Sequence, residues 1–289
     1  DLVRSLSEVF RAPGAEPVGR TIAFVGAKGG VGASTIAHNI AWAISKEIGT
    51  DTCLADLDLP FGTGGLDFNQ DPPQGIAEAV FSPDRVDTAF IDRLLSRCSD
   101  TLSLLAAPAT LDRLYDLGPE AFDPVMDVLR STVPNIVLDI PHGWTGWTRR
   151  MLVNADEILI VAAPDLANLR NAKNLMDLLR AARPNDAPPR YMLNQTGVPK
   201  RPEIKPSDFA KALECEPVAV IAFEPQIVGT AANNGQMIAE LEPGHRMTQQ
   251  FSDLALAMTG RHDTRKPKAG LLGPLAPLLD KITQLRKRA

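Results

Sequence analysis

A glycine-rich loop near the start of the chain stands between a strand-like run and a helical pattern, and it limits the folds that the chain can adopt. Residues 21–25 are apolar, residues 26–35 read G-A-K-G-G-V-G-A-S-T, and apolar residues recur at helical spacing over 34–48. In a strand, loop and helix of this kind, successive backbone N–H groups and the helix N-terminus can surround a phosphate. The start of the chain therefore predicts a phosphate-binding α/β unit.

Strand-like runs and helical patterns alternate along the rest of the chain. Further apolar runs typical of strands occupy residues 52–57, 101–106, 135–140, 157–163, 190–193 and 217–222, and helical patterns occupy 119–132, 166–182 and 206–213. This alternation predicts an α/β fold with a mostly parallel twisted sheet and helices on both faces. Ligands in such folds bind at the carboxyl ends of the strands, so the residues that follow positions 25, 57, 138 and 161 should converge on one site.

Charge is unevenly distributed along the chain. The formal net charge is −5, but residues 261–289 carry eight Lys/Arg against two Asp, which leaves −11 on the rest. Attraction to nucleic acid or to a membrane should therefore belong to this tail, while the acidic body should bind small anions through specific groups. Composition and pattern divide the chain into an N-terminal extension at 1–19, one domain at 20–260, a basic linker at 261–270 and an amphipathic helix at 271–289.

Composition excludes several classes of protein. The apolar fraction of 44% excludes a disordered or collagen-like chain, and no apolar stretch has the roughly 18 residues that a membrane-spanning helix needs. Cys53, Cys98 and Cys215 are odd in number and far apart, which favours reduced thiols in a cytosol over a disulfide frame. The opening at Asp1 lacks the pattern of a signal peptide, and we interpret the chain as a fragment of a longer protein.

The loop departs from the ordinary phosphate-binding motif. The motif G-x-x-x-x-G-K-[ST] would place glycine at Ala27 and lysine at Ala33, and neither is present. What remains is K-G-G-x-G-x-[ST], which begins at Lys28 and resembles the deviant Walker A motif of the MinD/ParA family of ATPases. The resemblance implies an ATP-bound homodimer in which Lys28 reaches the phosphates held by the partner. It also implies that the nucleotide and its magnesium ion are held by the loop, with the metal at Ser34 and the nucleotide at Gly29, Gly30, Val31, Gly32, Ala33, Ser34 and Thr35. The alternative is a glycine-rich turn with an incidental lysine.

Carboxylates follow two of the predicted strands. The D-L-D sequence at 56–58 resembles the first switch of the family, which implies that Asp58 lies at the magnesium ion and positions the attacking water. Residues 135–143 end in D-I-P-H-G and resemble the second switch, which implies that Asp139 holds Mg²⁺ through water. His142 replaces the small residue usual in the family, and we interpret it as exposed rather than catalytic. The alternative reading is that these acids are polar residues at strand ends.

Two later residues are assigned to the nucleotide base by the same resemblance. Asn194 matches the asparagine that reads adenine in the family, and its amide offers the donor and the acceptor that an adenine edge requires. It could equally cap a turn. Phe223 begins the segment that borders the base, where relatives commonly have proline. The implied cofactors are ATP or ADP and Mg²⁺.

The end of the loop narrows the resemblance to one branch of the family. The G-A-S-T sequence at 32–35 and its continuation I-A-H-N at 36–39 are similar to the CpaE/TadZ branch of Tad-type (type IVc) pilus assembly proteins. That implies a cytoplasmic switch, peripheral at the inner membrane of a cell pole, that recruits the pilus secretion motor ATPase and binds polar landmark proteins. Members of this branch usually carry a receiver-like domain upstream, which would precede residues 1–19.

Alternative functions stay open at this point. One is a DNA-partitioning ParA-type ATPase, although the acidic body makes DNA an unlikely partner. Another is a nucleotide-binding scaffold with little or no turnover, because Ala33 cannot supply the charge of the usual lysine. A metabolic P-loop enzyme would need residues for a second substrate, and none is visible. We expect slow, dimer-dependent ATP hydrolysis, and the predicted 271–289 helix could contact a membrane surface, a protein or DNA.

Overall fold

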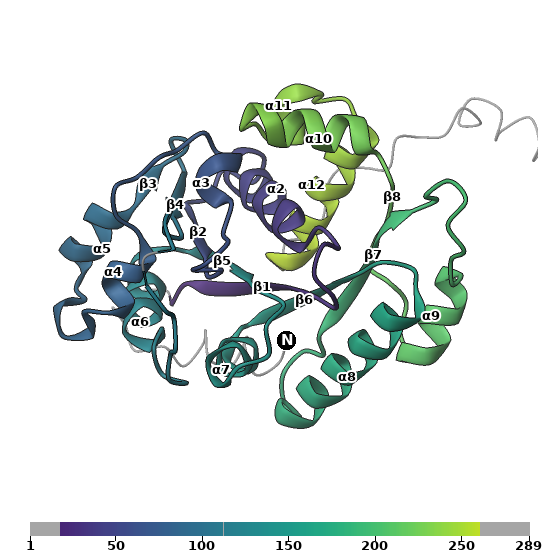
Figure 1. Ribbon diagram of the computed structural model, residues 1–289, viewed down its shortest axis with the longest axis horizontal. Helices are drawn as coiled ribbons and strands as arrows, with labels where there is room; N and C mark the ends of the chain where they lie inside the picture. The colour runs from purple at the N-terminus through teal and green to yellow at the C-terminus, as the bar shows by residue number, and fades with distance from the viewer. Residues whose placement is uncertain (1–17, 112, 261–289) are drawn as a thin grey trace, which may run out of the picture.

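The computed structural model describes residues 18–111 and 113–260 and confirms the predicted α/β fold (Figure 1). Its strands form one eight-stranded sheet in the order β3-β4-β2-β5-β1-β6-β7-β8. All neighbours in this sheet pair in parallel except β3 and β4, which are antiparallel at one edge. The strands are β1 Arg20–Gly26, β2 Thr52–Asp56, β3 Ser96–Arg97, β4 Leu102–Leu105, β5 Asn135–Ile140, β6 Glu157–Ala162, β7 Arg190–Thr196 and β8 Val220–Ala222.

The central strands are apolar on both sides because each side of the sheet is covered. Successive side chains of a strand point to opposite faces, so β1 contributes Ile22 and Phe24 to one core and Ala23 and Val25 to the other. All four side chains are buried. Strands covered on both faces read as continuous apolar runs rather than as an alternating pattern, which is why residues 21–25 predicted a buried strand.

Two layers of helices cover the sheet (Figure 1). The helix that follows the glycine-rich loop, α2, packs on one face beneath α10, α11 and α12, and the other face is covered by α6, α7, α8 and α9. The helices are α2 Ala33–Lys46, α3 Gly64–Asp67, α4 Ile76–Val80, α5 Thr88–Leu94, α6 Asp123–Thr132, α7 Gly146–Asn154, α8 Leu166–Ala182, α9 Pro206–Leu213, α10 Pro225–Asn234, α11 Ile238–Leu241 and α12 Arg246–Met258, with a 3₁₀ turn η1 at Pro83–Arg85.

The predicted elements are largely confirmed, with differences at some boundaries. The bounds of β5, α8 and α9 agree with prediction. The helix predicted over 119–132 begins only at Asp123, because Pro124 occupies its first turn, where a missing N–H costs nothing. The sequence analysis missed β3, α3, α4, α5 and α7, most of which are too short to show a periodic pattern, and also α10, α11 and α12. In α12 the signal was present, since its buried residues follow helical spacing.

Several sequence predictions fall outside the described part of the chain. The basic linker at 261–270, the amphipathic helix at 271–289 and residues 1–17 of the extension lie there. Among the described residues, no helix is both long and apolar enough to cross a membrane.

The strand order determines where a ligand can bind. β1 lies between β5 and β6 in the sheet. The connection that follows β1 leads to β2, on the far side of β5, and the connection that follows β5 crosses β1 to reach β6. Connections leave β1 and its neighbours in opposite directions at this point. A crevice therefore forms outside the carboxyl ends of these strands, and open α/β sheets bind ligands there.

Shortening a core side chain of α2 should destabilise the domain. Ile40 is fully buried between the sheet and the outer helices. Ile40→Ala should lower the free energy of unfolding by about 2–5 kcal/mol, because it removes apolar contact and leaves a cavity. The measurement is urea unfolding followed by circular dichroism. Leu114→Ala is the control, since Leu114 is 93% exposed and its truncation should change the value by less than about 0.5 kcal/mol.

Candidate nucleotide-binding site

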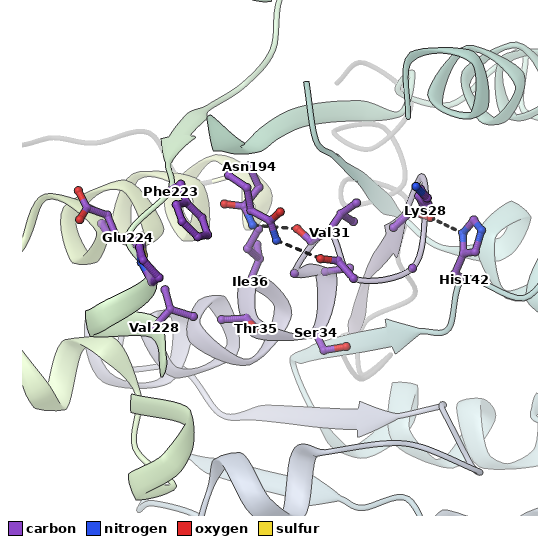
Figure 2. A pocket seen from close by; sticks show the side chains of 18 of the residues that line it. Lys28, Val31, Ser34, Thr35, Ile36, His142, Asn194, Phe223, Glu224 and Val228 are labelled. Carbon is purple, nitrogen blue, oxygen red and sulfur yellow. Dashed lines mark hydrogen bonds between the residues drawn. The ribbon is translucent and has the colours of Figure 1, made fainter. Parts of the chain in front are cut away.

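A cavity of about 470 Å³ opens at the carboxyl ends of β1, β5, β7 and β8 (Figure 2). It receives nearly all of the residues that the sequence assigned to a site, and Asp139 is the exception. The residues that line it are Gly26, Lys28, Gly29, Gly30, Val31, Gly32, Ala33, Ser34, Thr35, Ile36, Asp58, Ile140, Pro141, His142, Asn194, Gln195, Ala222, Phe223, Glu224, Pro225, Val228, Met247 and Phe251. Segments far apart in the sequence thus meet at one edge of the sheet.

The loop wraps one end of the cavity because glycines allow its backbone to turn. Gly30 and Gly32 have positive φ angles of 79° and 84°, which side chains with a Cβ rarely adopt. A Cβ at Gly32 would also lie 2.7 Å from Nδ2 of Asn194. Gly32 precedes α2, whose first turn contains no acidic residue and whose N-terminus makes no side-chain cap bond. The free N–H groups and the positive end of this helix therefore favour an anion in the cavity.

Positive charge at the cavity comes from its rim. Ala33 lines the cavity where the ordinary motif would place a lysine, and Lys28 is the one Lys or Arg among the lining residues. Lys28 is exposed. His142 is also exposed, as predicted, and its Nδ1 lies 3.0 Å from the carbonyl oxygen of Gly26. In Figure 2 Lys28 and His142 stand together at one end of the site.

The opposite end of the cavity is apolar. Phe223 and Val228 line it together with Met247 and Phe251, and Figure 2 shows the first two at the end away from Lys28. Asn194 stands between the loop and this end, where its Nδ2 donates a 2.8 Å hydrogen bond to the carbonyl oxygen of Val31. An aromatic and apolar surface next to a phosphate-binding loop is suited to a nucleobase.

The two aspartates that follow β2 have different surroundings. Asp56 is fully buried, and its carboxylate accepts hydrogen bonds from the backbone N–H of Gly64 at 2.9 Å and of Asp58 at 3.1 Å. It therefore organises the turn after the strand. Asp58 is half-buried and lines the cavity, and burial raises the pKa of its carboxyl group. Of the two, Asp58 has the access that a contact with magnesium or water requires.

Asp139 belongs to a buried group of charges beneath the loop. Its side chain is 3% exposed, and its Oδ2 lies 3.3 Å from Nε2 of His38. His38 is fully buried on α2, and its Nδ1 lies 2.7 Å from Oδ2 of Asp67 in α3. Burial opposes a charge on this imidazole, but hydrogen bonds and charges from Asp139 and Asp67 outweigh it and raise the pKa of His38 to about 10. Burial and the charge of Asp139 likewise raise the pKa of Asp56.

The sequence analysis missed the role of His38. It treated the residue only as part of the I-A-H-N sequence, because a histidine on an otherwise apolar helix face shows nothing of its partners. The signal available was the helical spacing, which places His38 on the buried side of α2 with Ile36 and Ile40. A buried imidazole needs a hydrogen-bonding partner, so an acid from another element could have been expected.

These residues fit a magnesium nucleotide unequally. Magnesium prefers oxygen ligands and keeps several waters, and Ser34 and Asp58 line the cavity with such oxygens. His38, Asp56 and Asp139 offer ligand atoms within 4.8 Å of one another. However, Asp56 already binds backbone N–H groups, and a charged His38 repels a cation. We interpret these three residues as an internal ion-pair cluster rather than as a metal site.

A phosphate loop, a free helix N-terminus and carboxylates at strand ends define a nucleotide-binding protein of the P-loop α/β class.

No protein-family model matches the chain. The septum site-determining protein MinD of Bacillus subtilis is 24% identical over 258 residues, which cover 84% of this chain and 90% of that protein. MinD of Thermotoga maritima is 25% identical over 284 residues, which cover 92% of this chain and 99% of that protein. A ParA family ATPase from Chlorobium tepidum has a similar structure, with a TM-score of 0.74, 26% identity and coverage of 82% of this chain and 98% of that one. In sequence and in fold the chain is thus similar to ATPases of the MinD/ParA family.

The His38 ion pairs should make stability depend on pH. The folded-state pKa of about 10 lies above the value of 6.5 for a free histidine, so the stabilisation is complete below pH 6.5 and is lost as pH rises through about 10. His38→Gln should lower the free energy of unfolding by about 3–5 kcal/mol below pH 6.5, because it leaves buried acids without a cation.

Above pH 10 the difference between wild type and His38→Gln should narrow. Urea unfolding of both proteins in EDTA across this pH range is the measurement. His245→Gln, which lies outside the cluster, serves as the control. A difference that is constant with pH would show that His38 is not charged in the folded protein.

Proposed function

We propose that the chain is an ATP-dependent dimerising switch with slow ATP hydrolysis. The observation that carries this proposal is the position of Lys28, the one lysine among the residues that line the cavity. Lys28 is exposed at the rim, and Ala33 stands where the ordinary motif has a lysine that acts within its own subunit. A bound triphosphate would be neutralised incompletely by backbone dipoles and Mg²⁺ alone. Lys28 of a second copy, arranged by two-fold symmetry, supplies the missing charge.

The proposed cofactors are ATP or ADP with Mg²⁺. MinD of Pyrococcus horikoshii, whose structure contains Mg-ADP, shares this fold with a TM-score of 0.71 at 20% identity. In this chain Lys28 acts on the phosphates of the partner, Ser34 and Asp58 contact the metal, and Asp139 reaches it through water. Asp58 also positions the attacking water, and Asn194 and Phe223 border adenine. Support for these roles is their common position at the cavity, apart from Asp139.

Exposed apolar side chains follow three strands whose carboxyl ends lie at the same edge of the sheet as the cavity, and they support a dimer through this edge. Phe61, Trp144 and Leu166 follow β2, β5 and β6, and they are 72%, 51% and 73% exposed. Because the carboxyl ends of parallel strands share one edge, these side chains lie on the same edge as the cavity. Grouped large apolar side chains on a surface are typical of interfaces.

The cellular role that we propose is positioning of Tad-type (type IVc) pilus assembly at a cell pole. Its support is the resemblance of residues 32–39 to the CpaE/TadZ branch. The proposed partners are the pilus secretion motor ATPase and polar landmark proteins, reached by a cytoplasmic protein peripheral at the inner membrane. Residues 271–289, for which the sequence predicts an amphipathic helix, are proposed to dock on a protein or a membrane surface. A polar focus of a fluorescent fusion, and loss of pili on deletion, would test this role.

A second candidate is a nucleotide-binding scaffold with little turnover. Ala33 favours it, because this residue removes the cation that usually acts within the subunit. The two candidates differ in whether the bound nucleotide controls assembly. DNA partitioning has less support, since the chain outside the basic tail carries −11.

ATP should control the oligomeric state through Lys28. Light scattering should give a mass near twice 31.1 kDa with a non-hydrolysable ATP analogue and Mg²⁺, and near 31.1 kDa with ADP and Mg²⁺. Lys28→Ala should abolish this dimer, because the phosphates lose the cation from the partner. Asp58→Ala should keep the dimer and slow its decay after ATP is supplied. Lys211→Ala, an exposed lysine on α9 away from the cavity, is the control.

The same mass in both nucleotide states would favour the scaffold. Loss of the dimer in Asp58→Ala but not in Lys28→Ala would contradict the roles proposed for these residues.

Trp144 should contribute to dimer formation without contributing to nucleotide binding by the monomer. Trp144→Ala should weaken dimerisation about tenfold or more, as expected for an aromatic side chain buried in an interface. Sedimentation velocity with the ATP analogue measures dimerisation, and titration with ADP measures monomer binding. Val18 is exposed and precedes β1, at the end of the strand away from the cavity, so Val18→Ala should change neither dimerisation nor ADP binding. Equal dimerisation of Trp144→Ala and wild type would place the interface elsewhere.

A further inference from the structure

Three carboxamide side chains donate hydrogen bonds to backbone carbonyl groups of the phosphate loop. Nδ2 of Asn171 lies 2.8 Å from the carbonyl oxygen of Ala27, and Nε2 of Gln195 lies 3.0 Å from that of Gly30. Nδ2 of Asn194 lies 2.8 Å from that of Val31. Figure 2 shows the bonds from β7 to the loop. A carbonyl oxygen can only accept a hydrogen bond, so the NH₂ end of each amide must face the loop.

These amides come from two elements that are otherwise separate from the loop. Asn171 lies on α8, while Asn194 and Gln195 are consecutive residues of β7. Consecutive side chains of a regular strand point to opposite faces and would not reach the same loop. Here the register of β7 with β8 shifts between Leu193 and Thr196, and Gln195 has a left-handed φ of 55°. This unusual conformation for a residue other than glycine lets both side chains reach the loop.

Fixing a carbonyl also fixes the direction of an N–H group. A trans peptide is planar, and its C=O and N–H point in opposite directions. A side chain that holds the carbonyl of Ala27 therefore holds the N–H of Lys28 in the opposite direction. The bonds to Gly30 and Val31 act in the same way on the N–H groups of Val31 and Gly32. These N–H groups are the donors that a phosphate loop offers to its ligand.

We propose that Asn171 and Gln195, together with Asn194, are positioning residues that hold the N–H groups of the loop in their phosphate-binding orientation. With Ala33 in place of lysine, backbone dipoles carry more of the attraction to the phosphates, and their prior orientation matters more. The inference rests on the proposed function, because it concerns the same nucleotide. It assigns Asn194 a contact with the loop in addition to its proposed position near adenine.

The test compares ligands that contain phosphates with one that does not. Asn171→Leu and Gln195→Met keep the size of the side chain and remove the donor without adding charge. Asn174→Leu is the matched control, since Asn174 is exposed on the same helix and does not line the cavity. Asn194 is left unchanged because it also borders the proposed base site. Isothermal titration measures binding of ADP with Mg²⁺, of inorganic pyrophosphate with Mg²⁺ and of adenosine to the full chain.

Each donor-removing variant should bind ADP and pyrophosphate about two- to tenfold more weakly, which corresponds to the loss of one hydrogen bond. The double variant should bind them more weakly still, while adenosine binding and the Asn174→Leu control match wild type. In wild type the backbone amide NMR resonances of Lys28, Val31 and Gly32 should shift when pyrophosphate binds. In the ligand-free variants the same resonances should differ from those of ligand-free wild type. If Asn171→Leu does not fold, the affinities of Gln195→Met for ADP, pyrophosphate and adenosine test the inference without it.

Wild-type affinity for ADP in the variants would overturn the inference. An equal loss for adenosine and ADP would overturn it as well, because it would show a general structural role for the amides. Failure of wild-type protein to bind ADP would overturn the proposed function itself, and the inference with it. The two failures are distinguishable, since the second is seen without any substitution.

Discussion

The structure around the cavity depends on the compensation of buried negative charge. Asp56 and Asp139 are partners in the register of β2 and β5, and Asp67 approaches the same place from α3. Uncompensated, such acids would strongly disfavour the folded state. His38 supplies the one buried cation in this cluster, and backbone N–H groups bind Asp56. The histidine thereby joins the helix of the phosphate loop to both segments that carry carboxylates toward the site.

The loop itself depends on hydrogen bonds from outside its own sequence. Its glycines permit the required turns but do not select one conformation, since glycine is freer than any other residue. Selection comes from α8, from β7 and from His142, all of which reach loop carbonyls. The loop is therefore a product of the tertiary fold, although its composition is visible in the sequence. The contact of His142 also links the segment that follows β5 with Gly26 at the start of the loop.

The difference between local sequence patterns and tertiary contacts explains which features the sequence could predict. Periodicity and strand-end position predicted the sheet, the loop and a pair of carboxylates after β2, because buried strands and glycine-rich turns have local signatures. That reasoning treated Asp56 and Asp58 alike, and the choice of Asp58 came from the family resemblance. Packing shows that Asp56 is the buried acid and Asp58 the accessible one. The contacts of His38, Asn171 and Gln195 join residues far apart in the chain, and no local pattern reports them. Short elements such as α3 escaped prediction for the related reason that tertiary contacts, not propensity, hold them.

The distribution of charge around the cavity is the reason for proposing that a second copy of the chain takes part in the site. Inside one subunit the phosphate end of the cavity offers oriented N–H dipoles and a helix N-terminus, but no cation beyond Lys28 among its lining residues. His38 does not change this balance, because its charge is already taken up by Asp67 and Asp139. Dipoles of this kind suffice to orient a phosphate, whereas a triphosphate with developing charge requires further cations. Lys28 is exposed at the rim of the cavity, where a second subunit could approach it as in the proposed dimer. In the proposed dimer, binding of nucleotide and formation of the interface would be parts of one equilibrium, and each would favour the other.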